Sequence, residues 1–274
     1  MKKLLTVMVG SSLLFTACND NTTQEEETVM TAAPISINQV SASPEFEGAQ
    51  IAIGKVTSTP EGDNNAIVSF QFDVKNYELM NQTNDAEAKM CANSEKGQHI
   101  HFILDNEPYA ALYKPEHQVT LAKNSEHYLL AFLSRSYHES IKTKGASLVY
   151  HFKVDENGTI QELDPPTEPM LFYSRPKGTY VGQNNTDNLL FDFFLWNTEI
   201  SEDGNHVMAH IKGNAVDTTI VVTNWKSYFL NNMPLGEQTI ELTLVDKDGN
   251  KIEGAMTNVT RAYTLAAEEP LPAE

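Results

Sequence analysis

An internal duplication constrains the fold of this chain more than any other feature of its sequence. Residues 51–79 align without a gap on residues 172–200, at an offset of 121 positions. The matched pairs include Phe70 with Phe191, Phe72 with Phe193, Asn76 with Asn197 and Glu78 with Glu199. Because so many matches in one order are not expected by chance, we predict two tandem copies of one domain. The copies cover about 48–155 and 168–265, and the proline-rich segment 164–169 links them.

Within each copy, the spacing of apolar residues is typical of β-strands. Apolar and polar residues alternate through 67–74 and 239–245, as they do in strands with one buried face. Turn motifs such as Asn157-Gly158 separate these segments. The one segment with helical character is short, at 85–92. We therefore predict an all-β fold made of two tandem immunoglobulin-like β-sandwich domains.

The N-terminus has the features of a lipoprotein export signal. Two lysines follow the initiator methionine, and the apolar stretch at 4–15 is shorter than the roughly 20 residues that span a bilayer. Thr-Ala then precedes Cys18 as in a lipobox, although Phe15 stands where leucine is commoner. We predict a signal peptide at 1–17 and a lipid on Cys18 that anchors the chain to a membrane. The alternative is an ordinary secretory peptide followed by a chance cysteine.

Two segments lack the periodicity of folded structure. Residues 18–47 are rich in Thr, Glu, Asn and Ser, so we predict a disordered tether from Cys18. About 30 such residues span roughly 30 Å as a random coil, which would hold the folded part away from the membrane. At the other end, 266–274 is predicted to be a disordered acidic tail.

The charge of the chain excludes a general role in nucleic-acid binding. The net charge is −18, and loss of the signal peptide removes two lysines and no acids, which leaves −20. Such a surface repels phosphate backbones and anionic headgroups, so no nucleic-acid partner is expected. It could attract cations or basic partners, but solubility is the favoured explanation. Cys91 is the only other cysteine, so no intramolecular disulfide is expected.

The first copy differs from the second by an insertion and by its histidines. The insertion covers 80–96. Six of the eight histidines lie in the first copy, namely His99, His101, His117, His127, His138 and His151. The alignment places Val207 and Ala209 at the positions of His99 and His101. Because the first copy alone carries these features, a specialised site is expected there.

His99 and His101 are the strongest candidates for metal ligands. They are two residues apart on a predicted strand, so both side chains point to the same face. With Met90 and Cys91 of the insertion they could bind copper or zinc. The alternative, without a cofactor, is that both histidines are half-buried hydrogen-bonding residues below the inserted loop.

A second candidate site is the polar segment 134–141. It resembles the Ser-Arg-x-His-x-x-Ile stretch of forkhead-associated domains, whose serine and arginine hold phosphothreonine. One extra residue separates Arg135 from His138, and the upstream Gly-Arg of those domains is missing. The candidate anion ligands are Arg135, His138, Lys142 and Lys144, with Arg175 and Lys177 on the interdomain side. The alternative is a polar loop at the end of a strand.

Other motifs argue against catalysis and against two further kinds of site. The chain has no Gly-x-Ser-x-Gly, no His-Glu-x-x-His, no glycine-rich phosphate loop and no dinucleotide fingerprint, so we predict that it is not an enzyme. Trp225 and its aromatic neighbours could stack on sugars, but a role in the core is favoured. Asp246 begins a calcium-like loop that lacks the required glycine and glutamate, so a hairpin turn is favoured.

Several segments resemble a family of small Bacteroidota lipoproteins that are often labelled phosphopeptide-binding proteins. They are the lipobox, the tether, and the stretches 97–106, 135–142 and 150–154. The resemblance implies an envelope lipoprotein with no established reaction, anchored in the outer membrane on its periplasmic face or at the cell surface. Acidic residues soon after Cys18, such as Glu25, are suggestive of the cell surface in that phylum.

Three functions therefore remain open. The first is a non-catalytic binding or assembly module, with the membrane and an unidentified envelope protein or extracellular ligand as its partners. The second is a copper- or zinc-binding envelope protein that uses the first domain. The third is a phosphopeptide- or anion-binding protein that uses Arg135 and the nearby lysines.

Overall fold

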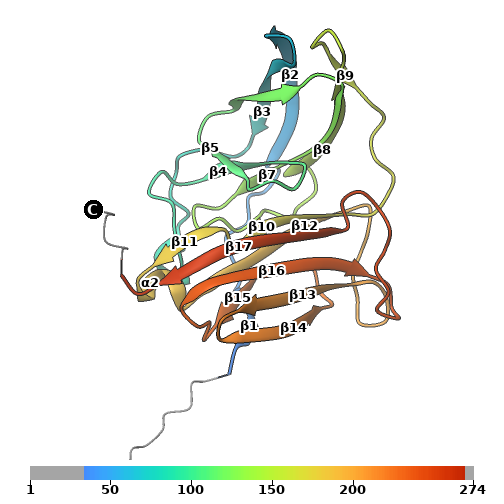
Figure 1. The fold of residues 1–274 in the computed structure, drawn as a ribbon. Helices are drawn as coiled ribbons and strands as arrows, with labels where there is room; N and C mark the ends of the chain where they lie inside the picture. The colour runs from blue at the N-terminus through green and yellow to red at the C-terminus, as the bar shows by residue number, and fades with distance from the viewer. Residues whose placement is uncertain (1–33, 269–274) are drawn as a thin grey trace, which may run out of the picture. The chain divides into compact units, whose positions relative to one another are not determined.

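The alternating segments of the sequence form β-strands that are arranged in four sheets in the described part of the chain (Figure 1). The computed structural model describes residues 34–268. The predicted signal peptide, Cys18 and residues 269–274 lie outside this range. No helix within it is long and apolar enough to cross a membrane.

The first copy contains a three-stranded and a five-stranded sheet. The smaller sheet has the order β2 (Gln50–Glu61), β3 (Asn65–Lys75) and β6 (Glu116–Ala122). The larger one has the order β5 (Ala110–Leu112), β4 (His99–Leu104), β7 (Ser125–Ser134), β8 (Ser147–Val154) and β9 (Ile160–Glu162). Buried side chains such as Phe70 and Phe152 fill the core, and their rings contact edge to face.

The second copy contains a four-stranded and a five-stranded sheet. The first has the order β1 (Ser36–Gln39), β15 (Tyr228–Asn231), β12 (Leu189–Trp196) and β10 (Met170–Arg175). The second has the order β11 (Gly178–Val181), β17 (Asn258–Ala266), β16 (Gly236–Val245), β13 (His206–Gly213) and β14 (Val216–Val222). Its core contains Phe191 and Phe193.

Strand order demonstrates the duplication directly. Without β1, β9 and β11, the first copy reads β2-β3-β6 with β5-β4-β7-β8, and the second reads β10-β12-β15 with β14-β13-β16-β17. Corresponding strands occupy corresponding places, as expected for an immunoglobulin-like sandwich. The predicted all-β fold with tandem β-sandwiches is confirmed. The predicted short helical piece is present as α1 (Ala86–Lys89), and a second short helix, α2 (Gln183–Thr186), follows β11.

The two histidines of β4 point away from the core of their own sandwich. Ile100 and Phe102 lie in that core, so His99 and His101, which alternate with them, point to the outer face of the sheet. This outer face is covered, because both histidine side chains are 0% exposed.

The residues that correspond to these histidines in the second copy differ from the prediction. Val207 and Ala209 lie in the second core, so they correspond to the core residues of β4 and not to its histidines. The outward positions of β13 that match His99 and His101 are His206 and Met208. The sequence alignment was wrong by one residue here, and such a slip on a strand places a side chain on the opposite face.

A third apolar cluster covers the outer face of the larger sheet of the first copy. Ile103, Leu130 and Phe132 of that sheet pack against residues of the second copy that include Phe172 and Phe194. The rings of Phe132 and Phe194 stack with centroids 5.4 Å apart. Burying one such phenylalanine is worth about 2–3 kcal/mol, so this cluster joins the two sandwiches firmly. The histidines of β4 lie at the edge of this junction.

Part of the predicted tether is ordered. Within 18–47, residues 36–39 form β1, which pairs antiparallel with β15 of the second copy. Lys89 holds the segment after β1, because its Nζ donates to the carbonyl oxygens of Ser41 at 2.9 Å and Ala42 at 3.1 Å. The prediction of disorder was therefore wrong for this stretch, because its few apolar residues, such as Ile37, pack on a distant core. Residues 18–33 lie outside the described range.

Candidate metal centre

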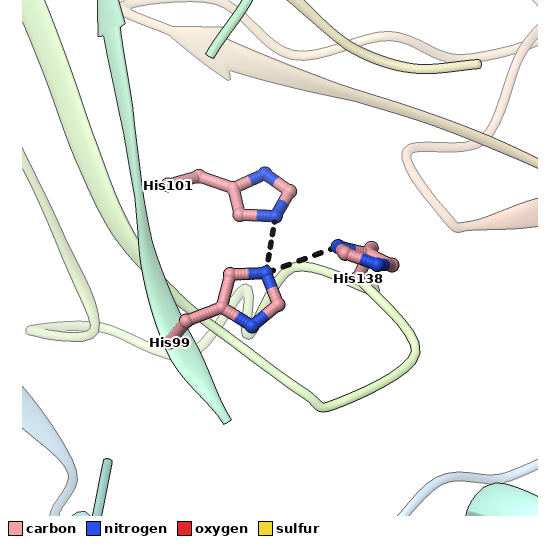
Figure 2. A group of neighbouring side chains, drawn as sticks. All are labelled: His99, His101 and His138. Carbon is pink, nitrogen blue, oxygen red and sulfur yellow. Dashed lines mark hydrogen bonds between the residues drawn. The ribbon is translucent and has the colours of Figure 1, made fainter. Parts of the chain in front are cut away.

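Three histidines from two segments converge at the junction of the sandwiches (Figure 2). His99 and His101 project from β4, and His138 lies on the loop between β7 and β8. His99 Nε2 lies 3.0 Å from His101 Nε2 and 3.0 Å from His138 Nδ1. One nitrogen of each ring lies within 4.8 Å of the other two. We call these residues the histidine triad.

A tight loop places His138 over the strand. Its backbone has a φ of 71°, a left-handed conformation that costs a non-glycine residue about 1–2 kcal/mol. Two backbone hydrogen bonds maintain the turn: His138 N donates to Arg135 O at 2.8 Å, and Arg135 N donates to Glu139 O at 2.9 Å. The loop therefore imposes the position of the ring, and strain of this kind is common at functional sites.

The outer nitrogens of the two β4 histidines have partners that orient the rings. His99 Nδ1 lies 2.8 Å from the carbonyl oxygen of Gly97, which can only accept, so Nδ1 carries the proton. His99 Nε2 is therefore the nitrogen with the lone pair, and it faces the triad. His101 Nδ1 lies 3.2 Å from Ser174 Oγ of β10, in the second copy. The carbonyl fixes the tautomer of His99, as such partners do for histidines that bind metals, whereas the serine hydroxyl can donate or accept.

Two ring nitrogens of the triad approach the same nitrogen of the third ring. A neutral imidazole nitrogen offers a single lone pair, yet His101 Nε2 and His138 Nδ1 both approach His99 Nε2 at 3.0 Å. If both neighbours donate, they compete for one lone pair. If only His101 donates, the lone pair of His138 Nδ1 can accept from the hydroxyl of Tyr109, which lies 3.2 Å away. A cation at the centre of the triad would instead accept a lone pair from each ring.

The rings are neutral at physiological pH. Burial lowers the pKa of His99 to about 4, and the positive charges of Arg175 and Lys177 add to the effect. Burial also lowers the pKa of His101 and of His138 well below 6.5. Neutral imidazole is the form that binds a metal, so the rings carry no extra proton that a metal would have to displace.

The spacing of the nitrogens suits a transition metal. For zinc–nitrogen bonds of about 2.0–2.1 Å in a tetrahedral site, neighbouring ligand atoms lie about 3.3 Å apart. The two separations from His99 Nε2, 3.0 Å each, are shorter than this by a few tenths of an ångström, and all three nitrogens lie within 4.8 Å of one another. A metal would therefore require the rings to shift around it. Three protein ligands leave a fourth position for another group.

Tyr109 forms one wall of the site. Its ring stacks on that of His101, with centroids 3.7 Å apart and an interplanar angle of 10°. Its hydroxyl oxygen lies 3.2 Å from His138 Nδ1. Burial raises the pKa of Tyr109, so the phenol keeps its proton. Sequence reasoning missed this residue, because nothing in the sequence indicated that the turn after β4 would fold back over the histidines.

The structure assembles only half of the metal-ligand set predicted from the sequence. His99 and His101 lie together, but the side chain of Met90 is 68% exposed. Cys91 is buried beside Ala86 and Tyr137, and it does not belong to the triad. Burial raises the pKa of the Cys91 thiol to about 12, which disfavours the thiolate that metals bind. The third ring is that of His138, which the sequence analysis had placed in the anion set.

The predicted anion ligands do not converge. Arg135 is buried, where it donates to Pro44 O at 2.7 Å and lies 3.4 Å from a carboxylate oxygen of Glu139. Lys142 Nζ lies 2.5 Å from Oδ1 of the buried Asp192 in the second copy. Lys144 is exposed, and His138 belongs to the triad. Arg135 and Lys142 thus have internal partners that an incoming anion would have to displace.

The two minor candidates have structural explanations. Trp225 is half-buried at the junction, and its indole Nε1 donates to Phe193 O at 3.0 Å. Asp246 Oδ1 accepts hydrogen bonds from the backbone N–H groups of Asp248 and Asn250, each at 2.9 Å. These contacts are those of a core anchor and of a hairpin turn.

Comparison with known proteins gives little beyond the fold. No protein-family model matches the chain, and no curated protein does. Among solved structures, the fibronectin(III)-like modules of Clostridium thermocellum CbhA match with 9% identity over 80% of this chain and 95% of that chain, at a TM-score of 0.26. The FN1–FN3 domains of chicken CNTN1 match with 10% identity over 81% of this chain and 66% of that chain, at a TM-score of 0.25. At such TM-scores the structures superpose poorly, so the description of the fold rests on strand order.

Proposed function

We propose that this protein is a metal-binding module of the bacterial cell envelope, and that His99, His101 and His138 hold one zinc or copper ion. The observation that carries the proposal is the convergence of three buried imidazole nitrogens, two of which lie 3.0 Å from the third. A cation at this point would accept a lone pair from each ring.

The choice of metals follows from the ligands. Neutral imidazole suits zinc, copper, iron and nickel, whereas magnesium and calcium prefer oxygen. No carboxylate belongs to the triad. Among the metals that imidazole binds, we propose zinc or copper, in agreement with the prediction from the sequence. We also retain the prediction that the protein binds its ligand without catalysing a reaction, because no catalytic motif occurs in the chain.

The proposed location follows from the N-terminal sequence. We propose that the mature chain begins at Cys18, carries lipid there, and lies at the outer membrane, on the periplasmic face or at the cell surface. Fifteen residues separate Cys18 from Pro34, the first described residue.

Metal titration of the mature chain tests the proposed function. The protein would be prepared without lipid as a Cys18→Ser variant, stripped with chelator, and titrated with Zn²⁺ or Cu²⁺ against a competing chelator. We expect one ion per chain, with a Kd in the micromolar range or below. His138→Gln should weaken binding at least about 100-fold, since it removes one of three ligands. His210→Gln is the matched control, because His210 lies on β13 and contacts Asp217.

Absence of saturable binding at micromolar metal would refute the proposed function. Equal affinity in the wild-type protein and His138→Gln would place the metal elsewhere. A pull-down from solubilised envelope, with and without chelator, tests whether a protein partner depends on the metal. A reproducible partner that chelator leaves unaffected would favour an assembly role that does not use the triad.

A further inference from the structure

A buried arginine that forms no ion pair with a carboxylate of the described residues lies beside the histidine triad. Arg175, at the end of β10, is only 7% exposed. Its Nη1 donates to the hydroxyl of Tyr180 at 2.6 Å, but its buried Nε has no hydrogen-bond partner. Within residues 34–268 no carboxylate forms an ion pair with it. A buried charge is normally paired, so Arg175 lacks an anion that its environment calls for.

Lys177 places a second positive charge at the same wall. Its Nζ lies 3.9 Å from the centre of the Tyr109 ring and donates to Tyr109 O at 2.7 Å. The Arg175 guanidinium carbon lies 5.6 Å from the centre of that ring. Burial lowers the pKa of Lys177 to about 8, which leaves the ammonium largely charged at pH 7. Within the described range, Lys177 has no carboxylate partner either.

These charges are close enough to influence a metal in the triad. Tyr109 stacks at 3.7 Å on His101, so both cations lie within about 10 Å of the His101 ring, which is about one Debye length at 0.1 M salt. The whole chain has 37 acidic and 19 basic residues, yet the charged side chains that lower the pKa values of the triad histidines are Arg175 and Lys177. A bare divalent cation entering this environment is repelled by both groups.

We propose that the triad binds its metal together with a small oxyanion, which completes the coordination of the metal and is held by Arg175 and Lys177. The inference rests on the proposed function and specifies the missing ligand. One oxygen of the anion fills the fourth metal position, which three histidines leave open. Another oxygen accepts hydrogen bonds from the guanidinium or the ammonium group, which are the usual donors to oxyanions. Carboxylate, hydrogencarbonate and phosphate share this chemistry.

Tyr109 connects the metal position in the histidine triad to the anion position beside Arg175 and Lys177. Its hydroxyl oxygen lies 3.2 Å from His138 Nδ1, at the edge of the triad, while both cations lie near its ring. The phenol can donate a hydrogen bond to an anion on the metal, because its hydroxyl lies at the edge of the triad. Metal and anion should therefore bind cooperatively, each raising the affinity for the other by the same factor.

The test measures zinc affinity as a function of the anion present. The Cys18→Ser mature chain would be titrated at pH 7 with free Zn²⁺ held by a chelator buffer, at constant ionic strength. The arms contain chloride alone, acetate, hydrogencarbonate or phosphate. We expect at least one oxyanion to tighten zinc binding tenfold or more relative to chloride. The arm that produces the enhancement identifies the class of anion.

Removing either cation should change zinc affinity in opposite directions without and with the oxyanion. In chloride alone, Lys177→Met should bind zinc at least as tightly as the wild type, because a repelling charge is gone. With the effective oxyanion, the enhancement should fall at least about fivefold. Arg175→Met should show the same pattern more strongly, and circular dichroism would check its folding because the residue is buried. Lys177 is only half-buried, so its variant preserves the test if Arg175→Met does not fold. Lys144→Met, at an exposed position, is the control and should behave as wild type.

The two proposals fail in different ways. Zinc affinity that is the same in all four arms, and unchanged by Lys177→Met, would overturn the anion inference and leave the metal site intact. An enhancement that persists in both cation variants would overturn the role of Arg175 and Lys177. Absence of zinc binding in every arm would refute the proposed function itself, and the anion inference with it.

Discussion

Acid should destabilise the metal-free protein through its buried histidines. Burial lowers the pKa of His99 from 6.5 to about 4, and it lowers the pKa of His101 and of His138 in the same direction. Between these pH values the unfolded chain binds protons that the folded triad does not. The free energy of unfolding therefore falls as the pH falls from about 6.5 to about 4. Above this window the stabilisation is complete and constant.

The size of the effect follows from the shift at His99. A change of one pKa unit corresponds to about 1.4 kcal/mol, so a shift from 6.5 to about 4 corresponds to about 3 kcal/mol. No discount for solvent screening is needed, because this side chain is 0% exposed. Such a loss is a substantial fraction of the roughly 5–15 kcal/mol that holds a protein folded. His101 and His138 add to it with the same sign.

Urea unfolding at a series of pH values would measure this loss. The mature chain and His99→Gln would be unfolded in the presence of chelator between pH 7.5 and pH 4, and the free energies of unfolding compared. Carboxylate titrations affect both proteins alike, so the difference isolates the imidazole. We expect the wild type to lose about 3 kcal/mol more than the variant over this range. His210→Gln, at an exposed position, should follow the wild type, and parallel curves for wild type and His99→Gln would refute the reasoning.

Three further predictions concern the junction and the metal. Phe132→Ala should lower the free energy of unfolding by about 3–5 kcal/mol in urea, because it opens a cavity where the two sandwiches meet; a loss below 1 kcal/mol would show that the junction contributes little. Asp192→Asn should lower the free energy of unfolding by about 3 kcal/mol, since it leaves Lys142 without its buried partner. Asp217→Asn should leave the free energy of unfolding almost unchanged, because Asp217 is exposed. Zinc at 100 times its Kd should add about 2.7 kcal/mol to the free energy of unfolding of the wild type. The same zinc should add at most about 0.4 kcal/mol to that of His138→Gln, because the variant binds at least about 100-fold more weakly.

The strand pattern was predictable because it is local. Period-two alternation at 67–74 predicted β3, and repetition of the same pattern at an offset of 121 residues predicted its counterpart β12. The same local rule placed His99 and His101 on one face of a strand. It did not identify which face was buried, because a slip of one residue in the alignment of β13 exchanges the two faces.

The remaining parts of the site depend on contacts that are distant in sequence. His138 reaches β4 through a loop whose left-handed turn has no reliable signature, since histidine at positive φ is uncommon. Arg175 and Ser174 approach the histidines from the second copy, and only packing between the sandwiches brings them there. The ordering of β1 has the same origin, because a four-residue strand is stable only against the sheet that receives it.

The sequence by itself thus determined the repeated all-β architecture and the pairing of His99 with His101, since both follow from short-range periodicity and from comparison of the chain with itself. Only the tertiary structure decided that these histidines are buried, that His138 completes their group, and that Arg175 and Lys177 lie beside them. Burial of the outer sheet face requires a second surface to cover it. That surface belongs to the other copy of the domain, so no local pattern in the first copy encodes it.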